Sequence, residues 1–184
     1  VKPLGNPTEA ALLLWLHDKK AEYLKIRASV EIIQQLTFST ERKYMATLVK
    51  SSALNKYLLY IKGAPEIILS KCLSVITPDK DIPLEAVKDS IEEQLLQYQN
   101  QAMRTLGFAY KEIEEEHIHT DIKELVNNGL TFLGIAAISD PVREDVPAAV
   151  HKCLDAGIDI KIVTGDTPAT VKEIGRQIDI WHDD

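Results

Sequence analysis

Residues 35–61 read QLTFSTERKYMATLVKSSALNKYLLYI, and this stretch decides the fold that the sequence predicts. It holds three short segments that are rich in β-branched, aromatic and other apolar residues, at 35–39, 45–50 and 57–61. Polar residues separate them at 40–43 and 51–56. Short strands joined by polar turns are typical of an antiparallel meander, which we therefore expect at the centre of this domain.

Helix signals flank the meander on both sides. Asn6-Pro7-Thr8-Glu9 suits a helix start, with Asn6 as the N-cap, Pro7 at the first position and Glu9 reaching back to the cap. A helix or helix pair should then run to about residues 30–33. Further elements are expected after the meander: a short helix from Pro65 to Leu69, a loop at 77–83, an amphipathic helix at 84–102, a strand at 106–110, an acidic loop at 112–116 and a short helix ending at Asn127-Asn128-Gly129.

The last third has a different rhythm. Leu130–Ile138 is a continuous apolar strand, followed by a helix at 147–156, a second buried strand at 158–163 and a helix at 168–178. Alternating strands and helices indicate a parallel α/β layer. We predict an α/β (α+β) protein with an antiparallel-sheet domain at 1–139 and a βα fragment of a second domain at 140–184.

Composition narrows the function classes. Hydrophobic residues are 45% and charged residues 27% of the 184 residues, which is typical of a globular protein. The net charge of -7 argues against nucleic acid as a main partner, because phosphate backbones need a basic face. The longest apolar stretch, Leu130–Ile138, is far shorter than the ~20 residues of a membrane helix.

Cys72 and Cys153 fit neither a disulfide framework nor a metal site, and we expect reduced core thiols. Both ends of the chain are expected to be boundaries within a longer protein.

Two runs in the meander region can carry nucleotide chemistry. Lys62-Gly63-Ala64-Pro65-Glu66 places a lysine at a strand end, then a glycine where a ligand can approach, then a helix start with free amides. The alternative is a strand-to-helix turn with a solvated lysine. Phe38 can stack on a purine while Lys43 contacts phosphates. The alternative there is a core phenylalanine beside an exposed turn.

Further candidates have equally plain structural alternatives. The capping role accounts for Glu9, and a charge at a helix C-terminus accounts for Arg104. Asp140, Arg143 and the run Thr164-Gly165-Asp166 follow buried strands, where parallel sheets bind ligands, although Asp166 also suits an N-cap.

Six runs, in order, resemble the cytosolic part of P-type ATPases, above all the calcium-pump-like type II branch. They are GNPTEAALL from Gly5, TFSTERKYM from Thr37, KGAPE from Lys62, MRTLGFA from Met103, LTFLGIAAISDPVR from Leu130 and IVTGD from Ile162. The first begins at residue 5 and the last ends at residue 166, so together they span nearly the whole chain. The resemblance implies a nucleotide-binding domain followed by part of a haloacid-dehalogenase-like phosphorylation domain.

The resemblance also implies roles for individual residues. Phe38 would stack on adenine, and Glu9 and Met45 would line the same pocket. Lys62 would lie deep in the pocket with Gly63 beside it, while Lys43 and Arg104 would approach the phosphates. The phosphorylation domain would contribute a further set of residues: Asp140, Arg143, Thr164, Gly165 and Asp166.

The family resemblance implies ATP as ligand and Mg²⁺ as cofactor of the full-length protein, on the cytoplasmic face of a membrane. Partners would be the phosphorylation, actuator and membrane domains of the same chain, or a second copy of this fragment. The family's DKTGT run, which carries the phosphorylated aspartate, and its GDGxND run do not occur here. We therefore expect a non-catalytic piece of a cation pump, most simply a calcium pump. The alternatives are a haloacid-dehalogenase-like phosphatase and a non-catalytic interaction module.

Overall fold

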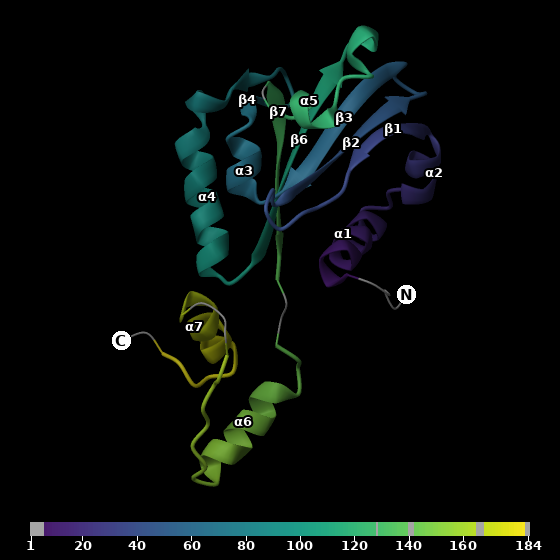
Figure 1. Cartoon of the computed structure of the whole chain (residues 1–184). Helices are drawn as coiled ribbons and strands as arrows, with labels where there is room; N and C mark the ends of the chain where they lie inside the picture. The colour runs from purple at the N-terminus through teal and green to yellow at the C-terminus, as the bar shows by residue number, and fades with distance from the viewer. Residues whose placement is uncertain (1–5, 128, 140–141, 165–167, 183–184) are drawn as a thin grey trace.

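A computed structural model describes residues 6–127, 129–139, 142–164 and 168–182. Its strands form one seven-stranded sheet in the order β1-β2-β3-β6-β7-β4-β5 (Figure 1). All neighbouring strands are antiparallel except β4 and β7, which run parallel. The strands are β1 (Val30–Leu36), β2 (Tyr44–Ser51), β3 (Lys56–Gly63), β4 (Cys72–Val75), β5 (Ile82–Pro83), β6 (Arg104–Ile113) and β7 (Leu130–Ile138). The predicted meander is confirmed as β1, β2 and β3.

The predicted helices form at most of the expected places. The described helices are α1 (Pro7–Asp18), α2 (Tyr23–Ala28), α3 (Pro65–Leu69), α4 (Lys88–Asn100), α5 (Ile122–Leu125), α6 (Val146–Asp155) and α7 (Pro168–Gln177), with 3₁₀ turns η1 (Leu84–Ala86) and η2 (Glu115–His117). Asn6 caps α1 as predicted, since its Oδ1 accepts from the Thr8 backbone N–H at 2.9 Å. Gly129 is left-handed, with φ of +78°, as the predicted stop after α5 requires.

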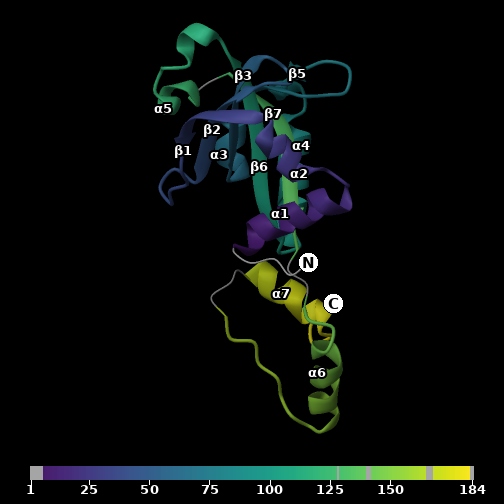
Figure 2. The same cartoon turned by 90° about the vertical axis from the view of Figure 1, so that its right-hand side faces the viewer.

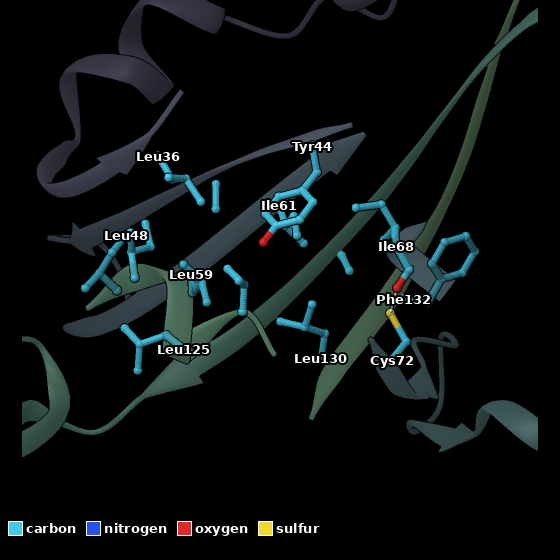
Figure 3. Packing of buried hydrophobic residues seen from close by; sticks show 14 of the residues in the cluster. Leu36, Tyr44, Leu48, Leu59, Ile61, Ile68, Cys72, Leu125, Leu130 and Phe132 are labelled. Atoms are coloured by element: carbon cyan, nitrogen blue, oxygen red, sulfur yellow. Dashed lines mark hydrogen bonds between the residues drawn. The ribbon is translucent and has the colours of Figure 1, made fainter. Parts of the chain in front are cut away.

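One face of the sheet carries the core. Alternation along β3 points Leu59 and Ile61 to this face, where they pack with Ile68 of α3 and Leu125 of α5 (Figure 3). Cys72 belongs to the same cluster, and burial raises the pKa of its thiol to about 12. The cysteine prediction is thus confirmed for a free, buried Cys72, whereas the free Cys153 is only half-buried.

The opposite face of the sheet is more open. Helices α3 and α4 lie on the core side, whereas α1 and α2 lie on the other side of the sheet (Figures 1 and 2). Helix α1 is strongly apolar, yet none of its residues is buried. We call this second side, with α1 lying along it, the open face.

Several strands differ from the predicted ones in position or were not predicted. Strand β1 begins at Val30 and ends at Leu36, because its backbone pairs with β2 over that range, so Phe38 lies beyond the strand. Strands β4 and β5 were missed, since Cys72–Val75 and Ile82–Pro83 are too short to show a period of two. Glu112 lies inside β6 and not in the predicted acidic loop.

The predicted parallel layer in the last third does not form. Strand β7 belongs to the same sheet as the meander and runs antiparallel to β6. Residues 158–163 form no strand, and Val163 is 95% exposed. A strand needs a neighbour for its backbone hydrogen bonds, and this segment pairs with no described strand. Helix α7 contacts α4 below the sheet, while α6 extends farther away (Figure 1).

Candidate functional site

Three side chains lie in a row across the open face, where β2, β3 and β6 pair. Met45 is opposite Lys62, and Lys62 is opposite Phe108. Directly opposite residues of antiparallel strands point to the same face of a sheet. All three residues are half-buried, and the Lys62 side chain is 29% exposed. The row therefore places a cation between two apolar side chains while leaving it within reach of solvent.

The N-terminus of α1 makes two polar contacts, one with Lys62 of this row and one with the start of β6. Glu9 Oε1 lies 3.0 Å from Lys62 Nζ. One residue earlier, Thr8 Oγ1 accepts a hydrogen bond of 2.7 Å from Arg104 Nη1 at the start of β6. Glu9, Lys62 and Arg104 are thus brought together by three different elements.

Two structural alternatives from the sequence are wrong at this position. Glu9 turns to β3 instead of back to its own N-cap, because Lys62 offers it an opposite charge. Arg104 begins strand β6 and does not lie at the end of a helix. Thr8 was missed as a partner of Arg104, since only its hydroxyl beside the cap sets it apart in the sequence.

Phe38 lies in the turn between β1 and β2 and is 58% exposed. The alternative of a core phenylalanine on a strand is therefore wrong. The turn is closed by the Lys43 N–H, which donates to Ser39 O at 2.8 Å. Lys43 is exposed and adopts φ of +59° at the point where the chain enters β2. Phe38 and Lys43 thus present an aromatic ring and a cation from one tight turn.

Gly63 is required by the protein's own packing. A Cβ added there would lie 2.6 Å from Tyr44 Cβ and would also collide with the carbonyl oxygen of Lys43. The Ala64 N–H donates to that same oxygen at 3.0 Å. The turn that carries Phe38 is therefore fixed against the end of β3. Gly63 is buried, so the predicted ligand approach to its backbone gains no support from the fold.

The predicted ligand contact with the free amides at the start of helix α3 also gains no support from the fold. Its first residue, Pro65, is buried, and its Cα would lie 2.9 Å from a Cβ added at Gly107 of β6. The start of this helix is thus packed against the sheet and not presented to a ligand.

An apolar cavity of about 660 Å³ lies beside the row, between α1 and β7. Phe108 belongs both to the row and to this cavity. The cavity is lined by Ala11, Leu12, Trp15, Leu16, Phe108, Leu133, Gly134, Ile135, Ala136, Ala137 and Ile138. The open face therefore combines a polar end at Glu9, Lys62 and Arg104 with an adjoining apolar hollow.

The two described candidates of the last third, Arg143 and Thr164, are not assembled into a site. Arg143 is exposed and its Nε lies 3.5 Å from Asp145 Oδ1. Thr164 is exposed and follows no strand. Asp140, Gly165 and Asp166 lie outside the described residues.

Within the described ranges, no group of three or more His, Cys, Asp or Glu side chains is arranged to hold a metal ion. Among the helices described above, none has the length and apolarity needed to cross a membrane.

Comparison with known proteins relates this geometry to a family. Residues 1–145 match the family model of the P-type ATPase cytoplasmic domain N. The calcium-transporting ATPase PAT1 of Dictyostelium discoideum is 38% identical over 178 residues, which cover 96% of this chain and 16% of that protein. The sodium/potassium-transporting ATPase subunit alpha-A of Artemia franciscana is 31% identical over 183 residues, covering 96% and 18%.

The plasma membrane calcium-transporting ATPase 1 of Mus musculus is 32% identical over 187 residues, covering 97% of this chain and 15% of that protein. The chain thus spans between 15% and 18% of the length of these three curated relatives. The similarity to them extends beyond the family model into the last third of the chain.

Proposed function

The chain belongs to the P-type ATPase family as its cytoplasmic, nucleotide-binding domain N, and from this premise we propose that it binds ATP on the open face. The observation that carries the proposal is Phe38, an aromatic ring that is 58% exposed in a turn fixed to the end of β3. An exposed ring of this kind does not contribute to the core. Stacking against a base would remove it from water. The cation Lys62 lies at that same strand end.

The contacts suggest how the site divides between base and phosphates. Phe38 stacks on adenine, and Met45 and Glu9 line the pocket beside it. Lys62 and Arg104 are held by Glu9 and Thr8 in the ligand-free protein. An exposed ion pair such as Glu9–Lys62 contributes about 0–1 kcal/mol, so phosphate oxygens can replace Glu9 as the partner of Lys62 at little cost.

Lys43 adds a second phosphate-binding cation from the Phe38 turn. Gly63 would support the site indirectly, because its lack of a side chain lets this turn pack against the end of β3. It needs no contact with the ligand. The charge on Lys43 is exposed, so its contribution should weaken as salt screens it.

We further assign the chain to a pump that couples ATP hydrolysis to cation transport, with the domain on the cytoplasmic face of a membrane. We propose calcium as the transported ion, because the relatives at 38% and 32% identity are named calcium-transporting ATPases. The relative at 31% identity is named a sodium/potassium-transporting ATPase subunit, so sodium and potassium are the alternative ions. In the full-length protein Mg²⁺ would accompany ATP.

Residues 140–184 are proposed to belong to the phosphorylation domain of that longer protein. Thr164, Gly165 and Asp166 would contribute to its phosphoryl site, together with Asp140 and Arg143. The rest of the polypeptide would complete the fold around residues 158–163, whose apolar side chains include the exposed Val163 and Ile158.

Calorimetric titration of AMP, ADP and ATP into variants of the chain tests the nucleotide site. Phe38→Ala should weaken all three nucleotides by about fivefold to a hundredfold, because stacking contributes ~1–3 kcal/mol and every adenine nucleotide uses it. Lys43→Ala should weaken ATP more than AMP, and high salt should shrink that difference.

Matched controls are Leu24→Ala, at an exposed apolar residue of α2, and Lys123→Ala, at an exposed cation of α5. Neither control should change the binding of any nucleotide. An unaltered ATP affinity in Phe38→Ala would remove the proposed base site. Equal losses for AMP and ATP in Lys43→Ala would remove Lys43 from the phosphate contacts.

A further inference from the structure

Arg42 makes two contacts inside the turn that carries Phe38. Its Nη2 donates to the carbonyl oxygen of Thr37 at 2.8 Å, and its backbone N–H donates to Ser39 Oγ at 3.2 Å. Thr37 and Ser39 are the two residues on either side of Phe38. The guanidinium thus closes the loop around Phe38 from within.

The Arg42 side chain is directed into the turn. It is half-buried, and its Nε is a buried nitrogen without a hydrogen-bond partner in the described part of the chain. Leaving a buried donor unpaired has a cost, so the remaining contacts of this group must hold it in place. Phosphate-binding arginines frequently use two parallel N–H donors of the guanidinium, whereas here Nη2 already donates to the Thr37 carbonyl oxygen.

The turn is also anchored at its other end. The Lys43 N–H closes it onto Ser39 O at 2.8 Å, and Lys43 O accepts from the Ala64 N–H at the end of β3. The Arg42 side chain connects this anchored end of the turn to the carbonyl oxygen of Thr37, the first residue after β1. Without this hydrogen bond, the segment 37–41 would stay anchored at both ends but would lose the side-chain contact between them.

We propose that Arg42 is a positioning residue, which holds Phe38 in the exposed orientation that stacks on adenine. The inference rests on the nucleotide site proposed above. Pre-organising a binding loop improves affinity by removing the entropy cost of ordering it on binding. A residue that acts only through Phe38 cannot contribute more to binding than the Phe38 ring itself contributes.

A double-mutant cycle tests this role, with calorimetric titration of AMP, ADP and ATP. Arg42→Met keeps most of the aliphatic stem and removes the guanidinium. It should weaken all three nucleotides by the same factor, about threefold to tenfold, because the lost order of the loop affects the shared base. In a Phe38→Ala background the same substitution should change nothing. Arg27→Ala on α2 is the control for loss of an exposed arginine and should leave binding unchanged.

Three results would overturn the inference. A loss that grows from AMP to ATP and persists without Phe38 would identify Arg42 as a direct phosphate contact. Unchanged binding in Arg42→Met, alongside weakened binding in Phe38→Ala, would leave the nucleotide site intact and remove the positioning role. Unchanged binding in Phe38→Ala itself would remove the proposed site, and the inference with it.

A second variant guards against misfolding of the first. Ser39→Ala removes only the hydroxyl that accepts from the Arg42 N–H. It should give a smaller loss with the same independence of phosphate number, and the circular dichroism spectrum should match that of the parent chain. A Ser39→Ala loss that depends on phosphate number would contradict the proposal as directly as one in Arg42→Met.

Discussion

Gly63→Ala tests whether the junction between β3 and the Phe38 turn holds the site together. The added methyl would lie 2.6 Å from Tyr44 Cβ and 2.7 Å from Tyr44 Cα. Backbone on a neighbouring strand cannot rotate away, so β2 must shift. Overpacking of this kind costs about 1–3 kcal/mol. For a chain of this size, each 1 kcal/mol lowers the melting temperature by roughly 2–4 °C.

Urea unfolding followed by circular dichroism measures this cost. With a slope of about 2 kcal/mol/M, the midpoint should fall by about 0.5–1.5 M. ATP affinity should fall roughly tenfold at the same time, because the shift moves the Phe38 turn relative to Lys62.

Gly107→Ala is the matched control, since Gly107 pairs with Gly63 on the next strand. Its Cβ would lie 2.9 Å from Pro65 Cα and 3.3 Å from Ile68 Cβ, so it disturbs α3 instead of the turn. It should lower the urea midpoint and leave ATP affinity nearly unchanged. Full stability and normal ATP binding in Gly63→Ala would refute the reasoning.

Two further predictions concern regions away from the nucleotide. Burial raises the pKa of Cys72 to about 12, so its thiol should stay protonated near neutral pH and resist maleimide in the native protein, whereas the half-buried Cys153 should react first. Equal labelling of both under native conditions, measured by mass spectrometry, would argue against a buried Cys72. Amides of residues 159–163 should exchange with D₂O much faster than those of 58–61, because this segment pairs with no described strand. Comparable protection of the two segments by NMR would contradict this picture.

Local chemistry was enough to predict the central elements. Asn6 beside Pro7 marks a helix start whatever surrounds it, and the cap is formed as expected. The apolar run at 57–61 likewise placed Lys62 at a strand end, and β3 forms over Lys56–Gly63. These features depend on residues a few positions apart, which is the range that periodicity and capping describe.

Predictions failed where tertiary partners decide the outcome. Residues 158–163 have the apolar run of a buried strand, yet no strand of the described ranges lies beside them. Glu9 had a sufficient local role at the cap, but Lys62, which is 53 residues away, provides a stronger partner. The close approach of Gly63 to Lys43 also arises only once β2 and β3 pair.

An amide chemical-shift titration of the ¹⁵N-labelled chain with ATP would show directly whether ATP binds on the open face. We expect saturable shifts around the Phe38 turn, at Met45, at Lys62 and at the start of β6, with α6 and residues 158–164 unaffected. The absence of shifts at millimolar ATP, or shifts confined to the last third of the chain, would contradict the account.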